Sequence, residues 1–129
     1  MVTVASEGLH EPSELIGDAV IDRHRVIVSL MEELEAVDWY DQRVAATKDE
    51  SVKALLAHNR DEEKEHAAMA LEWLRRHDPV LDENLRTYLF TSVPITEVEE
   101  EAMAGNPAAE PAPEGDGSLG IGSLKGMHP

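Results

Sequence analysis

Two long segments without proline constrain this fold more than any other feature of the sequence. Residues 13–47 hold no proline, and their single glycine, Gly17, stands near the start. Pro12 followed by Ser13 suits a helix start, because proline cannot continue a helix backwards and serine can cap one. We therefore expect one long helix over about residues 13–47.

A second segment without proline follows after a short connection. Asp49 or Ser51 can cap a helix that runs to about His77, where Asp78-Pro79 ends it, because the residue before a proline disfavours helical backbone. Two long helices joined by a short turn form an antiparallel hairpin. We expect a third, shorter helix around residues 81–91, so the predicted fold class is all-α.

The expected core is small for a chain that folds alone. Thr96 and Glu99 have capping-box spacing and predict one further acidic helical fragment. The chain has only five aromatic residues, and two helices with one apolar face each have no third layer to cover them. A twofold dimer doubles the helix count to four. We therefore expect a four-helix bundle that forms only on dimerisation.

The net charge and the absence of cysteine limit the chemistry. The 27 Asp and Glu against 11 Lys and Arg give a formal net charge of -16, and there is no cysteine. Such an acid surplus repels phosphate backbones and anionic lipid, so we expect cations as partners, and neither nucleic acid nor a membrane. A metal site would therefore need carboxylates and imidazoles as ligands.

No apolar run approaches the about 20 residues of a membrane span, and residues 1–10 lack a signal-peptide pattern. Both observations favour a soluble intracellular protein.

The composition changes abruptly at Gly105. Residues 105–116 are rich in proline, alanine, glycine and acid, which predicts a disordered linker. The chain becomes apolar again at Leu119, Ile121 and Leu124. These three residues indicate either a peptide ligand on a tether or a tail that contains three aliphatic residues by chance.

One glutamate and one Glu-x-x-His pair interrupt the apolar faces of the two long helices. In the first helix, alternating steps of three and four residues give an apolar face interrupted by one glutamate; its members are Val26, Leu30, Glu33, Val37, Tyr40 and Val44. In the second helix, such steps place Glu63 and His66 on one face, although Glu62 with His66 is also sterically possible. The members of that face are Val52, Leu56, Asn59, Glu63, His66, Ala70 and Trp73. A carboxylate on an apolar face needs a compensating cation. The plain alternative is a solvated acidic face with a surface histidine.

This residue set is half of the ligand set of four-helix di-iron carboxylate proteins, in which it occurs twice. The helices contain no second Glu-x-x-His. A twofold axis would complete the set, with Glu33, Glu63 and His66 of each of two copies around two metal ions. Carboxylates with one imidazole per metal suit iron or manganese, with zinc as a competitor.

Glu32 and Glu35 lie beside Glu33 in the sequence and share a helix face, because residues three apart stand on the same side of a helix. They would form a vestibule that attracts cations toward Glu33. A solvated acidic helix face explains the same spacing equally well.

The residues His58, Glu62 and Glu65 follow four-then-three spacing, and together they could hold a cation. Ordinary surface residues explain this pattern at least as well. Trp39 and Tyr40 follow the first-helix glutamates and are explained by packing, although Tyr40 lies on the apolar face and could line a site.

Four segments of the chain are distinctive, namely residues 31–43 (MEELEAVDWYDQR), 57–66 (AHNRDEEKEH), 71–76 (LEWLRR) and 85–91 (LRTYLFT). They closely resemble the encapsulated ferritins of bacteria. The resemblance covers about residues 11–91. The tail segment 117–125 (GSLGIGSLK) is similar to the peptide that directs cargo into encapsulin nanocompartments, which is an independent match.

The resemblance implies a ferroxidase whose di-iron centre forms only at a subunit interface, with iron as the cofactor. The implied ligands are Glu33, Glu63 and His66. The resemblance further implies that Glu32 and Glu35 form the site where metal enters. Trp39 would lie near a secondary metal site, which in the family is made by the positions that correspond to His58, Glu62 and Glu65.

The resemblance also implies an assembly and a location. Homodimers would form a ring, decameric in the family, inside an encapsulin shell in the bacterial cytoplasm, where Fe(II) is oxidised and stored as mineral. Leu119, Ile121 and Leu124 would bind the shell protein. The expected domains are a flexible N-terminus (1–12), a half-ferritin helical domain (13–104), a disordered linker (105–116) and a targeting peptide (117–129).

Two other functions fit the sequence. One is a non-catalytic helical cargo or adaptor protein whose acidic residues only keep it soluble. The other is a zinc- or manganese-binding protein on the same scaffold. The metal that co-purifies, and whether oxygen is consumed, would discriminate among the three.

Overall fold

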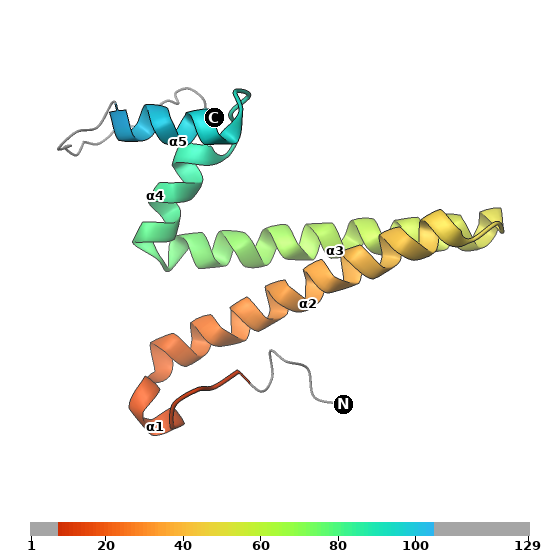
Figure 1. Ribbon diagram of the computed structural model, residues 1–129. Helices are drawn as coiled ribbons and strands as arrows, with labels where there is room; N and C mark the ends of the chain where they lie inside the picture. The colour runs from red at the N-terminus through yellow and green to blue at the C-terminus, as the bar shows by residue number, and fades with distance from the viewer. Residues whose placement is uncertain (1–7, 105–129) are drawn as a thin grey trace. The chain divides into compact units, whose positions relative to one another are not determined.

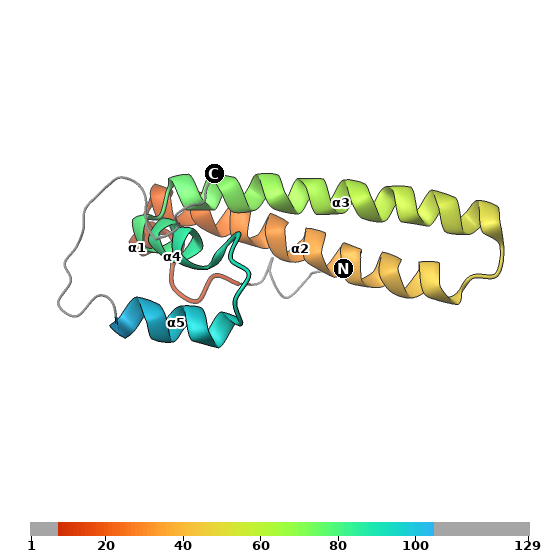
Figure 2. The ribbon, with the colours of Figure 1, turned by 90° about the horizontal axis from the view of Figure 1, so that it is seen from above.

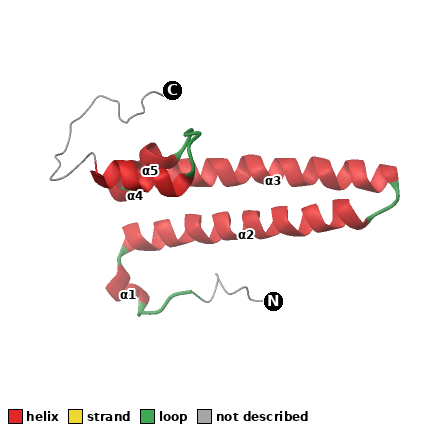
Figure 3. Cartoon of the chain, turned by 45° about the horizontal axis from the view of Figure 1, so that its top comes forward, coloured by secondary structure: helices red, strands yellow, loops and turns green. Residues whose placement is uncertain are grey.

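The computed structural model of this chain describes residues 8–104. Its regular elements in that range are all helices, which confirms the predicted all-α class (Figure 3). They are α1 (Ser13–Ile16), α2 (Asp18–Ala46), α3 (Glu50–Arg76), α4 (Pro79–Tyr88) and α5 (Ile95–Ala104). The predicted linker and the targeting residues Leu119, Ile121 and Leu124 lie outside the described residues.

The described residues divide into two compact units between His77 and Asp78. In the first unit, α2 and α3 lie side by side and antiparallel, as Figures 1 and 2 show. The predicted hairpin is therefore confirmed. None of the helices in the described range is long and apolar enough to cross a membrane.

Asp49 fixes the start of α3. Its Oδ1 accepts hydrogen bonds from the backbone N–H of Ser51 at 2.9 Å and of Val52 at 3.0 Å, and from the Ser51 hydroxyl at 2.6 Å. These hydrogen bonds, with the Ser51 hydroxyl first, lower the pKa of Asp49. An N-cap that satisfies the free N–H groups of the first turn favours a helix start at this point, so Asp49 is the cap and Ser51 is not.

The prediction of one continuous helix over residues 13–47 is wrong at Gly17. There the backbone has φ 92° and ψ 155°, which separates the single turn of α1 from α2. Glycine adopts positive φ without the steric penalty that a Cβ would impose. The sequence shows the glycine, and the structure shows that it takes this conformation.

The second unit holds α4 and α5, which contact each other. Asp78 caps α4 through a 3.0 Å hydrogen bond from the backbone N–H of Leu81, and Pro79 occupies the first helical position, where its missing N–H costs nothing. The third helix therefore starts and ends earlier than the predicted residues 81–91. α5 includes Thr96 within its first turn, so the predicted capping box is wrong.

The hairpin buries little of its apolar surface. In α2 the predicted face is confirmed as half-buried, from Val26 through Glu33 to Val44. Among the described residues of this unit only Ala67 and Leu74 are buried, whereas large residues such as Ile27 and Leu55 are exposed on the outside of the hairpin. The stability of a fold depends on the apolar area that it removes from water. We therefore expect this unit to have little stability as a single copy.

The predicted apolar face of α3 is partly wrong. Val52 is 40 % exposed, and the His66 side chain is 50 % exposed. The less exposed row contains Ala67 in place of His66; its members are Leu56, Arg60, Glu63, Ala67, Ala70 and Leu74. The predicted members Asn59 and Trp73 are also half-buried. Helical periodicity alone is compatible with either row of residues facing α2. The contact with α2 decides which of the two rows is less exposed.

Candidate metal centre

Glu33 is a half-buried carboxylate in the middle of α2. Its Oε1 is buried and has no hydrogen-bond partner. Burial raises the pKa of this carboxyl group, because desolvation disfavours the charged form. Buried polar atoms nearly always have a partner, so an orphaned carboxylate oxygen is a position where a cation fits.

Glu63 and His66 lie three residues apart on α3 and approach each other. The Nδ1 of His66 is 3.8 Å from Oε1 of Glu63, and their side chains are 50 % and 29 % exposed. That separation is longer than a hydrogen bond, so the two groups stand near one another without being tied together.

Charges on both long helices act on Glu33. After desolvation, the next influences on its pKa are His66, which lowers it, and then Glu63 and Glu32, which raise it. Glu33 on α2 is therefore within electrostatic range of Glu63 and His66 on α3. We call Glu33, Glu63 and His66 the candidate metal centre, and its use as a metal site stays a prediction.

A single chain does not complete this centre. In residues 8–104 no group of three or more His, Cys, Asp or Glu side chains is close enough to hold a metal ion. Glu63 and His66 remain partly exposed on the hairpin surface. Two carboxylates and one imidazole are donors that suit iron, manganese or zinc.

Glu32 and Glu35 are both exposed on α2. The negative charge of Glu32 contributes to the raised pKa of Glu33, which places it within electrostatic range of the candidate metal centre. Like charges around one buried carboxylate make that carboxylate harder to ionise, and they also attract cations.

The structure pairs two of the predicted secondary-site residues. His58 Nε2 lies 3.2 Å from Glu62 Oε2, on side chains that are mostly exposed. Glu65 is exposed on the same helix. The i, i+4 spacing accounts for the His58–Glu62 contact without a metal ion.

Trp39 has a different neighbour. The guanidinium carbon of Arg43 lies 6.0 Å from the centre of the Trp39 ring and 5.6 Å from that of Tyr40. Sequence reasoning did not single out Arg43, although its spacing of four residues from Trp39 and three from Tyr40 predicts this cation–π contact on a helix.

Residues 8–92 match the sequence model of a family described as EncFtn-like. An encapsulated ferritin-like protein of Rhodospirillum rubrum is 60 % identical over 127 residues, covering 95 % of this chain and 91 % of that protein. A ferritin-like protein of Thermotoga maritima is 63 % identical over 100 residues, covering 75 % of this chain and 85 % of that protein.

Two more comparisons extend these matches. An encapsulin nanocompartment cargo protein of Myxococcus xanthus is 47 % identical over 47 residues, covering 36 % of each chain. A crystal structure of a protein from Nitrosomonas europaea superposes with a TM-score of 0.67 at 62 % identity, and it covers 68 % of this chain and 97 % of that one. The family model ends at residue 92, so α5 lies beyond it.

Proposed function

Because this chain belongs to the EncFtn-like family, we propose that it is a ferroxidase, which oxidises Fe(II) to Fe(III) at a di-iron centre shared between two copies. The observation that carries the proposal is the buried, unpartnered Oε1 of Glu33, within electrostatic range of Glu63 and His66. A bound cation would give this oxygen the partner that it lacks.

The second copy supplies the other half of the centre. A twofold axis beside the exposed side of Glu63 and His66 would bring a second Glu33, Glu63 and His66 into place. The same contact would cover apolar residues that the hairpin leaves exposed, such as Leu55 and Met69. Dimers would then assemble into a ring, a decamer by resemblance to the family.

The residues of the chain would act in a short sequence. Glu32 and Glu35 attract Fe(II), and the carboxylates of Glu33 and Glu63, with the imidazole of His66, bind it. Each Fe(II) loses one electron to dioxygen or peroxide. The carboxylates favour the Fe(III) state, because it is the harder and more highly charged ion.

We further propose that the chain is cargo of an encapsulin shell. The names of the relatives from Rhodospirillum rubrum and Myxococcus xanthus support this assignment. Leu119, Ile121 and Leu124 would bind the shell protein, and the oxidised iron would be stored as mineral inside the shell.

A secondary metal site is a further proposal, and its candidate residues are His58, Glu62, Glu65 and Trp39.

An anaerobic iron titration followed by air tests the ferroxidase proposal. We expect stoichiometric Fe(II) binding and then oxygen consumption, both lost in Glu63→Ala and His66→Ala. Unchanged rates of iron oxidation in these variants would contradict the assignment. A non-catalytic cargo protein would bind no stoichiometric iron, and a zinc or manganese protein would consume no oxygen.

The shared centre has a separate test. Because the metal ions would bridge two copies, iron should shift the protein toward larger assemblies, which mass measurement of metal-free and iron-loaded samples detects. Identical mass distributions would contradict the shared site.

Deletion of residues 116–129 should leave iron oxidation intact and abolish packaging, and packaging of the truncated chain would overturn the targeting role.

A further inference from the structure

Arg60 and Asp41 form a polar contact between the two long helices. Arg60 Nη1 donates a hydrogen bond to Asp41 Oδ1 at 3.1 Å, although the two residues are 19 positions apart in the sequence. The pairs His58–Glu62 and Glu63–His66, by contrast, each join residues of one helix. Only a contact across the hairpin limits how α2 lies along α3.

Arg60 stands in the less exposed row of α3, between Leu56 and Glu63. Its side chain is 23 % exposed, so its guanidinium is partly shielded from water and is stabilised by paired carboxylates. Here it is paired twice, because its Nε also donates to Asp61 Oδ1 at 3.1 Å. A planar guanidinium held at two of its nitrogens has a fixed orientation, so the Arg60–Asp41 bridge is directional.

This bridge lies about one helical turn from Glu63 along α3 and about two turns from Glu33 along α2. Arg60 precedes Glu63 by three residues on α3, and Asp41 follows Glu33 by eight residues on the antiparallel α2. Apolar contacts along the hairpin have no preferred direction and permit one helix to slide past the other. A slide of one turn, about 5.4 Å, would break the bridge and carry Glu33 away from Glu63.

We propose that Arg60 is a positioning residue, whose bridge to Asp41 fixes the register of α2 against α3. That register decides where Glu33 stands relative to Glu63 and His66. The effect on metal binding rests on the function proposed above, whereas the register itself does not, and the two are measured separately.

The register is measured without metal by the distance between two spin labels. The chain has no cysteine, so Ser29→Cys and Ala68→Cys, at exposed positions of α2 and α3, introduce the labels alone. Labelled chains diluted into unlabelled ones report one hairpin at a time. We expect Arg60→Gln to broaden or shift the distance distribution, and the exchanged pair Asp41→Arg with Arg60→Asp to restore it.

The consequence for the centre is measured by titration with zinc ion, which binds the same donors without redox chemistry. We expect Arg60→Gln to weaken zinc binding about tenfold, the size of effect typical for residues that orient metal ligands. The exchanged pair should recover most of this loss. Arg25→Gln is the matched control, because Arg25 pairs with Asp22 inside α2 at 2.7 Å and should change neither measurement.

Each outcome has a defined meaning. An unchanged distance distribution in Arg60→Gln overturns the proposal. A changed distribution with unchanged zinc binding supports the register and contradicts its effect on the candidate metal centre. If Arg60→Gln does not fold, Asp41→Asn removes the same bridge from its more exposed side and must give the same result. Loss of zinc binding in Arg60→Gln but not in Glu33→Gln would leave Arg60 important and contradict the proposed centre instead.

Discussion

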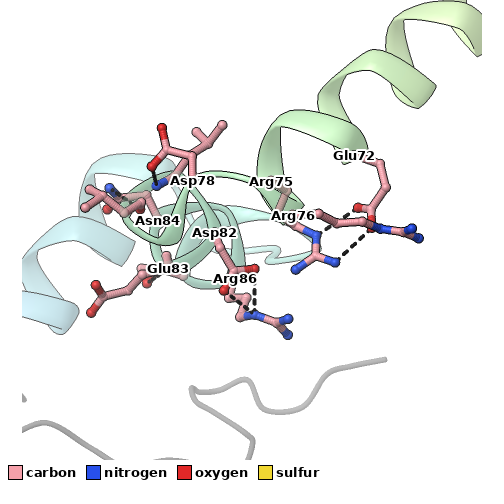
Figure 4. A network of polar contacts seen from close by, with 11 residues as sticks. Glu72, Arg75, Arg76, Asp78, Asp82, Glu83, Asn84 and Arg86 are labelled. Atoms are coloured by element: carbon pink, nitrogen blue, oxygen red, sulfur yellow. Dashed lines mark hydrogen bonds and ion pairs between the residues drawn. The ribbon is translucent and has the colours of Figure 1, made fainter. Parts of the chain in front are cut away.

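Two carboxylates on the same hairpin have opposite electrostatic surroundings. Glu33, in the middle of α2, has a buried oxygen without a partner and a raised pKa, mainly through burial. Glu72, near the end of α3, accepts hydrogen bonds from Arg75 at 2.8 Å and from Arg76 at 2.6 Å (Figure 4). These two arginines, Arg75 first, lower the pKa of Glu72 to about 2.

The presence or absence of a positively charged partner distinguishes acids that stabilise the fold from acids that are candidates for a function in this very acidic chain. The two arginines that neutralise Glu72 follow it by three and four residues, so this ion-pair cluster is complete within one copy. No group in the described residues pairs with Glu33 Oε1 in this way. An acid whose compensating charge is missing is the better candidate for a metal ligand.

The largest expected effect concerns iron oxidation. Glu33→Gln keeps the shape of the side chain but removes its charge, so we expect the initial oxidation rate to fall by at least about tenfold, because even changes around a metal ligand have effects of that size. Glu72→Gln is the matched control and should oxidise iron at the normal rate. Equal rates in the two variants would remove the distinction between these glutamates.

The next effect is the pH dependence of zinc binding. Since the pKa of Glu33 is raised above its ordinary value of 4.5, protons compete with metal at this carboxylate above pH 4.5. Zinc binding by the wild type should therefore weaken more steeply with falling pH than binding by Glu33→Gln. Calorimetric titrations over a pH series measure both slopes, and parallel slopes would show that Glu33 is not a ligand.

A smaller effect is expected on metal-free stability. A raised folded-state pKa means that ionised Glu33 opposes folding, so Glu33→Gln should slightly increase the free energy of unfolding at neutral pH. The gain should disappear as the pH falls through the raised pKa of Glu33. Denaturant titrations with chelator present measure it, and a loss of stability would mean that Glu33 has a structural partner.

The smallest effect is the acid dependence that Glu72 contributes. Its lowered pKa means that the unfolded chain takes up a proton first, so its stabilising contribution is complete above pH 4.5 and is lost between pH 4.5 and about 2. Thermal unfolding of the wild type and Glu72→Gln should therefore differ slightly at neutral pH and converge near pH 2. Curves that stay parallel down to that pH would contradict the arginine pairing.

The sequence by itself determined the all-α class and the two long helices. The absence of proline predicted the hairpin of α2 and α3, and capping preferences left Asp49 and Ser51 as the candidates for the start of α3, of which the structure selects Asp49. Periodicity selected Glu33 and the Glu63–His66 pair as residues on or near the contact between the helices. These are local properties, because caps and helical spacing depend on residues a few positions apart.

Tertiary structure decided what depends on residues far apart in the sequence. The positive φ of Gly17 interrupts the first helix, and the choice of buried row leaves His66 half-exposed. The bridge from Arg60 to Asp41 spans 19 residues, and the missing partner of Glu33 Oε1 follows from the packing of one helix on another. Spacing along a chain cannot predict the buried row, the bridge or the unpartnered oxygen, because these arise only when two helices meet in one register.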